Sequence, residues 1–255
     1  MRKHLKYILL LLPLVLMTNV AYAQLVVQDN FTGASTSYDW KAFNGACLTA
    51  GNNTGNIPAC VGLPYYKGQT LIGGVSGQLP DPVGQGALRF TNGYTQGAPS
   101  GDFDYGFNQT GGIISNFTFP SNEGLDVTFT AISYAGDSGG PRQDGADGIS
   151  FFLINGNYPA SDTGGLGGSL GYDCSNGNAV YNGIVGAYLG LGIDEYGNFL
   201  NPGDNTNSGP GFQPSRIGLR GAGNIAWTWL HQNYPDDYPS GLSASEQQTA
   251  VQETC

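Results

Sequence analysis

Residues 146–153 read ADGISFFL, and positions 149–154 are apolar almost throughout. A run of this length and composition predicts a β-strand buried on both faces. Shortly before it, residues 125–134 read LDVTFTAISY, where Leu125, Val127 and Phe129 alternate with polar residues. This alternation predicts a strand with one face on a core. Together the two stretches indicate a protein built mainly from β-strands.

Short β-type runs separated by turn residues continue along the chain, and helical periodicity is nearly absent. Gly contributes 42 of the 255 residues, well above its usual share of about 7%, as expected for a β protein with many turns. Strands without crossover helices favour an antiparallel β-sandwich, so we expect an all-β fold with very little helix. In addition to 125–134, the predicted strands are residues 25–27, 87–91, 113–119, 148–154, 187–194 and 216–220.

One helix is expected near the end of the sequence, where Ser243 and Glu246 have the spacing of a capping box. The loops at 51–58, 73–86 and 201–214 are long for a sandwich, and long ordered loops are common places for binding sites.

Residues 1–23 have the pattern of a secretory signal peptide: a basic start, an apolar run over 8–17, and the sequence Ala-Tyr-Ala before residue 24. No later run approaches the roughly 18–20 apolar residues needed to cross a bilayer. We therefore expect a protein that is secreted or held at the cell surface. Residues 24–255 show no internal repeat and no linker, so we expect them to form a single domain.

The formal net charge is −10, and it becomes −13 once the three basic residues of the signal peptide leave. This acidity argues against nucleic acid and anionic membranes as partners. In an exported chain the four cysteines favour disulfides over thiol catalysis or a zinc site. Of the three pairings, we favour Cys47 with Cys60, which closes a short loop, and Cys174 with Cys255. A cysteine is an unusual last residue, so we expect either that the natural protein continues beyond Cys255 or that this sandwich ends differently from others of its kind.

The sequence GDSGGP at 136–141 matches the surroundings of a trypsin-like nucleophile at Ser138. Such a serine needs a histidine earlier in the chain, and the one upstream candidate leaves with the signal peptide. A hydrolase elbow would allow Ser138, Asp194 and His231, but it requires a helix directly after the serine, where this chain has GGPRQDGADG. Ser138 is therefore interpreted as a loop residue.

Three stretches, taken in order, resemble the core of the L-type lectins, the family of legume lectins and their animal and bacterial relatives. They are ADGISFFL at 146–153, GGSLGYD at 167–173 and LGIDEYGNFLNP at 191–202. The resemblance covers roughly residues 25–220 and implies a concanavalin-like jelly-roll sandwich. The stretches DNFTGASTSYDW at 29–40 and CLTAG at 47–51 also look like the N-terminal lectin-type domains of large bacterial surface proteins, including some pilus-tip adhesins.

The resemblance implies a calcium site in the third stretch. Asp194 would provide its carboxylate, Tyr196 its backbone carbonyl and Asn198 its amide oxygen, while Asn201 would stand at the last ligand position. Alternating oxygen ligands of this kind suit Ca²⁺. Asn201 replaces an acid of the family, and Asp204 or a water could complete the set. Gly192 stands where legume lectins have a glutamate, so a second, transition-metal site is not expected.

The resemblance also implies a sugar site. Asp147 would accept two sugar hydroxyl groups, Gly168 would donate its amide, and Asn198 would be held by the calcium ion. In the family the peptide bond at Ala146-Asp147 is cis. Tyr196 and Tyr172 are the candidates for stacking on the sugar ring. The expected function is calcium-dependent carbohydrate binding in adhesion or recognition at a bacterial cell surface, without enzymatic activity.

Two other functions stay open. A β-glucanase on the same fold would place three acids along one strand, but this chain has Gly192, Asp194 and Glu195 there, so the first acid is missing. An interaction module of a large adhesin, without sugar specificity, is the second. For Trp227, Trp229 and His231 there are two interpretations: a satellite packing cluster, which we favour, or a second contact with carbohydrate or protein.

Overall fold

The computed structural model describes residues 26–61, 75, 79–91, 109–122, 124–133, 145–158, 160, 162–200, 209–223 and 225–255. The predicted signal peptide and Ser138 lie outside these residues. In the described part strands outnumber helices, and the sheets are antiparallel, as expected for an all-β chain. The two α-helices of this part, α1 (Trp227–Asn233) and α2 (Ala244–Thr254), come last in the sequence.

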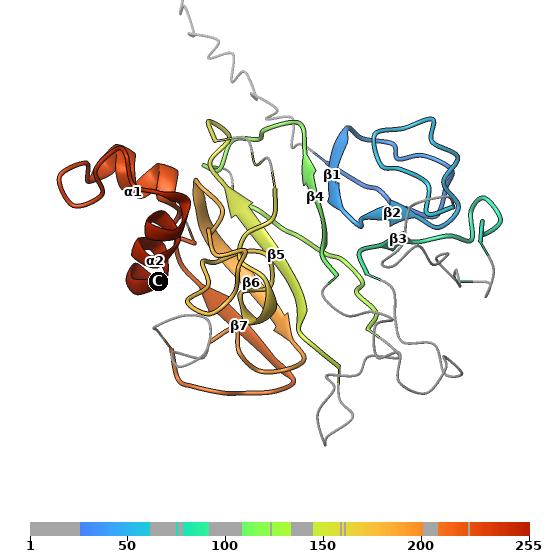
Figure 1. Cartoon of the computed structure of the whole chain (residues 1–255). Coiled ribbons are helices and arrows are strands. Elements are labelled where there is room, and N and C mark those ends of the chain that lie inside the picture. Colours follow the sequence, from blue (N-terminus) through green and yellow to red (C-terminus); the bar gives the residue numbers. More distant parts are fainter. Residues whose placement is uncertain are drawn as a thin grey trace, which may run out of the picture.

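The central sheet contains β5 (Gly148–Ile154), β6 (Ala187–Asp194) and β7 (Arg216–Arg220), in that spatial order. Figure 1 shows it between the helices and the ribbons formed by the earlier strands. The bounds of all three strands are those predicted from the sequence. In the register, Asp194 pairs with Gly148 on one side and with Arg216 on the other.

The inner face of the central sheet lies on the main core. Tyr172 and Phe199 are fully buried there, and Phe152 packs against them. The inward positions of β6 include Gly190 and Gly192, and a Cβ atom at Gly192 would lie 2.5 Å from the ring of Phe199. The missing side chains therefore allow two large rings to lie directly against the sheet.

The outer face of the central sheet is also apolar. It carries the alternate residues of the three strands: Ile149, Phe151, Leu153, Leu189, Leu191, Ile193, Ile217 and Leu219. β5 is half-buried, so the expectation that it is buried on both faces is wrong. Phe129 stacks on Phe151 with ring centroids 6.0 Å apart, while Ile217 at the sheet edge is 71% exposed.

Two smaller ribbons are formed by earlier strands. β1 (Trp40–Asn44) pairs with β4 (Gly111–Ser115), and β2 (Cys47–Leu48) pairs with β3 (Leu88–Arg89). β3 is shorter than the predicted 87–91, and β4 begins and ends earlier than the predicted 113–119. The disulfide between Cys47 and Cys60, one of the two pairings favoured from the sequence, closes the loop after β2.

The strand predicted at 125–134 is wrong for the described residues 125–133, which form none, and so is the strand predicted at 25–27 for the described residues 26 and 27. Apolar and polar residues alternate in 125–133, but all of these residues are exposed, and the segment pairs with no strand among the described residues. Leu125 and Phe129, which were expected to face a core, are about half exposed.

The helices pack as a satellite of the central sheet. α2 begins at the predicted capping box, in which Ser243 N donates to Glu246 Oε2 (2.8 Å). The second disulfide, between Cys174 and Cys255, holds the end of α2 to the long connection between β5 and β6. Leu230 and Val251 are buried beside Cys174, with Trp227 and Trp229 packed around them. These two tryptophans thus belong to a packing cluster.

The described helices are too short and too polar for any of them to span a lipid bilayer.

Candidate functional site

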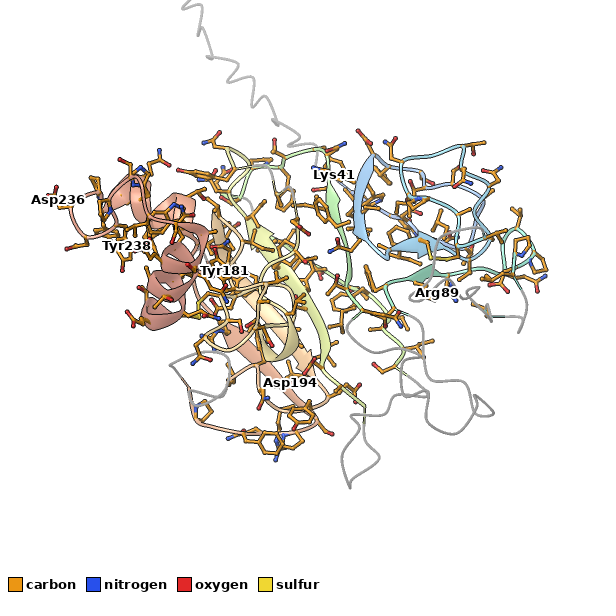
Figure 2. All side chains as sticks on the ribbon, viewed as in Figure 1. Lys41, Arg89, Tyr181, Asp194, Asp236 and Tyr238 are labelled. Carbon is orange, nitrogen blue, oxygen red and sulfur yellow. A yellow bond between two sulfur atoms is a disulfide. The ribbon has the colours of Figure 1, made fainter. Side chains whose placement is uncertain are left out.

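The candidate site lies where β6 ends and the chain turns toward β7. The amides of Glu195 and Tyr196 both donate to the carbonyl oxygen of Asp147, over 3.0 and 3.1 Å. Asp147 directly precedes β5, and Gly148 pairs with Asp194. The structure therefore brings Asp147 next to the loop that carries Asp194, Tyr196 and Asn198. Figure 2 shows Asp194 at the end of the sheet, away from Tyr238 of the helical part.

The loop closes around the carboxylate of Asp194, which is 4% exposed. Its Oδ1 accepts the amide of Gly197 and its Oδ2 the amide of Phe199, both at 2.8 Å. Burial raises the pKa of Asp194, against the lowering effect of these amides and of Asn198 N–H. Because the backbone wraps around the carboxylate, Asn198 is buried in the same turn.

On its other side this loop is hydrogen-bonded to residues 211–215. Gly211 N donates to Leu200 O (3.1 Å), Gln213 N to Gly197 O (2.9 Å) and Ser215 N to Glu195 O (3.1 Å). This ladder continues the pairing of β6 with β7 into the connecting loop. The predicted ligand position Asn201 and its substitute Asp204 lie outside the described residues.

Gly168 lies in a neighbouring turn. It is buried in the 3-10 helix η2 (Gly167–Ser169), which ends at Leu170 in the left-handed conformation. Ser150 Oγ on β5 donates to the carbonyl of Leu170 (2.8 Å) and so connects this turn to the strand that follows Asp147. Asp147, Gly168 and Asn198, the residues expected to hydrogen-bond the sugar, thus lie on three segments that hydrogen bonds connect through β5.

The peptide bond between Ala146 and Asp147 is cis, as the resemblance implies. Gly148 follows with φ of 144°, a conformation that L side chains rarely adopt, and a Cβ atom there would collide with the carbonyl of Ile193. Glycine is therefore required at this position for β5 to start beside β6 directly after Asp147. Asp147 itself is partly exposed, so its surroundings leave it accessible from solvent.

The ligands expected for calcium, the carboxylate of Asp194, the carbonyl of Tyr196 and the amide side chain of Asn198, would all bind through oxygen atoms, which suits this ion. A carboxylate has about four lone-pair sites, and amides of Gly197, Asn198 and Phe199 take up to three of them. This leaves room for one bond from Asp194 to a cation. No cluster of three or more His, Cys, Asp or Glu suited to a metal occurs in the described parts of the chain. The calcium site expected here would not form such a cluster, because only one of its ligands is a carboxylate and the others are carbonyl and amide oxygens.

Gly192 faces the same side of β6 as Asp194, two residues before it. The ring of Phe199 fills the space where a side chain of residue 192 would lie. A second acidic ligand or catalytic acid therefore has no room at this position.

Two aromatic residues were candidates for stacking on a sugar, and the structure separates them. Tyr172 is fully buried between Phe152 and Phe199, so its assignment as a possible platform is wrong. Tyr196 is half-buried and meets the exposed Phe212 edge to face, with centroids 5.5 Å apart. Phe212 was missed because it belongs to no motif, although it lies in the loop 201–214 noted as a possible binding loop.

His231 lies in the helical part of the protein. Its ring stacks on Trp227, and its Nδ1 lies 2.6 Å from the carbonyl oxygen of Tyr238. These contacts give His231 a structural environment of its own, separate from the loop of Asp194.

No protein-family model, curated protein or solved structure matches the chain.

Proposed function

We propose that the chain is an exported, calcium-dependent carbohydrate-binding protein of the L-type lectin kind, which acts in adhesion or recognition at a bacterial surface. The observation that carries the proposal is the pair of hydrogen bonds from Glu195 N and Tyr196 N to Asp147 O. They join the residue expected to accept sugar hydroxyls to the loop expected to hold the ion. The signal-peptide pattern and the two disulfides support export.

In this proposal the central sheet is one layer of a concanavalin-like jelly-roll sandwich. A sheet that is exposed to water on one face has polar residues there, but the outer face of this sheet is apolar and its inner face already lies on the main core. Ile217 and Leu219 on the outer face are too exposed and too close together for an ordinary solvated surface. A second layer over this face would bury them.

The ion would be held by the carboxylate of Asp194, the carbonyl of Tyr196 and the amide oxygen of Asn198, with Asn201 or Asp204 completing the set. Calcium, when bound, would supply a fixed positive charge that orients Asn198. Asp147 would then accept hydrogen bonds from two sugar hydroxyls, and the amide of Gly168 would donate one. Charge-assisted bonds of this kind replace those that the sugar makes to water.

Binding is favoured over glycoside hydrolysis because retaining glycosidases need two carboxylates about 5–5.5 Å apart. On the inner face of β6 the position before Asp194 is Gly192, and the ring of Phe199 occupies the space beside it. An interaction module without sugar specificity is the second candidate, favoured by the apolar outer face of the sheet.

Thermal unfolding in EDTA and then in millimolar calcium tests the ion site. An ion that binds the folded state alone raises stability by RT ln(1 + [L]/Kd), about 2.7 kcal/mol at a hundredfold excess over Kd. We expect the unfolding temperature to rise with calcium in the unaltered protein and not in Asp194→Ala. Asp236→Ala, an exposed acid in the helical part, is the matched control and should respond normally.

A glycan array in calcium then tests the sugar site. Binding that Asp147→Ala abolishes, and that Asp236→Ala retains, would support the lectin. A well-folded protein that shows neither a calcium shift nor array binding would contradict the proposal and leave the interaction module.

A further inference from the structure

Phe212 is an exposed aromatic residue beside the candidate sugar site. Its side chain is 42% exposed, yet its ring contacts Tyr196 edge to face at 5.5 Å between centroids. Tyr196 in turn donates its amide to Asp147 O over 3.1 Å. Phe212 thus contacts Tyr196, which is itself hydrogen-bonded to Asp147.

The position of Phe212 is fixed by the backbone on both sides. Gly211 N donates to Leu200 O and Gln213 N to Gly197 O, so the residues before and after Phe212 are both bonded to the candidate ion loop. Any substituent at Gly197 would collide with the backbone of Gln213 and Pro214, which shows how closely the two segments pack. A ring held in this way costs little conformational entropy when a ligand packs against it.

We infer that Phe212 and Tyr196 together form an apolar wall of the carbohydrate site, and that the site binds glycosides with an aromatic aglycone more tightly than the matching methyl glycosides. The inference rests on the proposed function, because it assigns a ligand class to that same site. Two rings at an angle provide a face and an edge, and aromatic ligand groups pack favourably against both. A methyl group at the same position covers much less of this surface.

Calorimetry with matched pairs of phenyl and methyl glycosides of mannose, glucose, galactose and N-acetylglucosamine, in calcium, tests the inference. For the sugar that binds, we expect the phenyl glycoside to have a Kd about three- to tenfold lower than the methyl glycoside, the range that one aromatic pair provides. In Phe212→Ala this ratio should fall to about one. Phe212→Tyr keeps the ring and should keep most of the preference.

Phe129→Ala is the matched control, because Phe129 is similarly exposed at 47% and also has a ring partner, Phe151. It should leave the ratio unchanged. A ratio near one in the unaltered protein, or a ratio that Phe212→Ala does not alter, would overturn this inference while calcium-dependent binding of the methyl glycoside would still support the lectin. If none of these glycosides binds, the inference is wrong, and the proposed function is wrong as well when the glycan array shows no binding and calcium does not raise the unfolding temperature.

Discussion

Arg220 forms an ion pair through its Nε with the carboxylate of Asp173, where both side chains are largely buried. Its Nη1 also donates to the carbonyl of Phe199 over 2.8 Å, and its guanidinium group lies over the ring of that residue. One cation at the end of β7 thus connects the turn after η2 to the end of the candidate ion loop. Asp173 has a further partner in the amide of Cys174, at 2.9 Å.

Arg220→Met should destabilise the fold by about 3–5 kcal/mol, because it leaves the buried carboxylate of Asp173 without its countercharge. Urea unfolding measures this change. Arg216→Met, on the same strand but exposed, is the matched control and should alter stability by no more than about 0.5 kcal/mol. Equal effects of the two substitutions would show that the ion pair contributes nothing.

The loss of Arg220 should also make stability depend more steeply on pH. Burial already raises the pKa of Asp173, and Arg220 opposes this most strongly, so the pKa rises further in Arg220→Met. A carboxyl group whose pKa is higher in the folded than in the unfolded protein stabilises the fold at pH values below its unfolded pKa, which is about 3.9. This stabilisation is lost as the pH rises through the pKa of the folded state. The stability deficit of Arg220→Met should therefore grow from about pH 4 to neutral pH. A deficit independent of pH would contradict this cause.

Gly148→Ala should be strongly destabilising, because it combines a left-handed φ with a collision against the carbonyl of Ile193. Gly84→Ala separates the two causes, since Gly84 also has positive φ but nothing lies within 4 Å of its added Cβ. We expect about 1–2 kcal/mol for Gly84→Ala and about 1–3 kcal/mol more for Gly148→Ala. Denaturant unfolding checks both, and a similar cost at the two glycines would show that β5 shifts freely.

The two disulfides should contribute unequally to stability. They close loops with sequence separations of 13 and 81 residues, and chain entropy assigns about 3 kcal/mol to the shorter loop and about 4.5 kcal/mol to the longer. Replacing Cys174 and Cys255 by serine should therefore cost about 1.5 kcal/mol more than replacing Cys47 and Cys60. Unfolding of the two double variants under identical conditions measures the difference, and the reverse order would contradict the entropic origin.

The central strands could be predicted from the sequence because their patterns are local. Apolar runs bounded by turn residues set the bounds of β5, β6 and β7, and Ser243 with Glu246 set the start of α2. α1 could not be predicted in the same way, because no side chain caps it and its aromatic residues are also common in strands. Its packing against Val251 and Cys174 depends on residues that are distant in sequence.

The residues of the candidate site could be named from the sequence, but their burial and their contacts could not. The place of Asp147 beside the loop of Asp194 follows from the register of β5 with β6, which pairs Gly148 with Asp194 and was not predicted from the sequence. The burial of Tyr172 could not be foreseen, because it depends on the empty inward positions of β6, where Gly190 and Gly192 admit rings. Phe212 reaches Tyr196 through a backbone ladder that has no sequence signature.

The disulfide between Cys174 and Cys255 also determines how the protein would bear mechanical tension. A pull applied at Cys255 passes through the sulfur atoms to Cys174, across a sequence separation of 81 residues. The residues between the two cysteines carry no tension, and they include β6 and the loop of Asp194 and Asn198. Asp147 precedes Cys174 and therefore lies in the part of the chain that is under tension. At about 3.3–3.6 Å per extended residue, roughly 28 nm of chain is withheld from stretching until the disulfide is reduced.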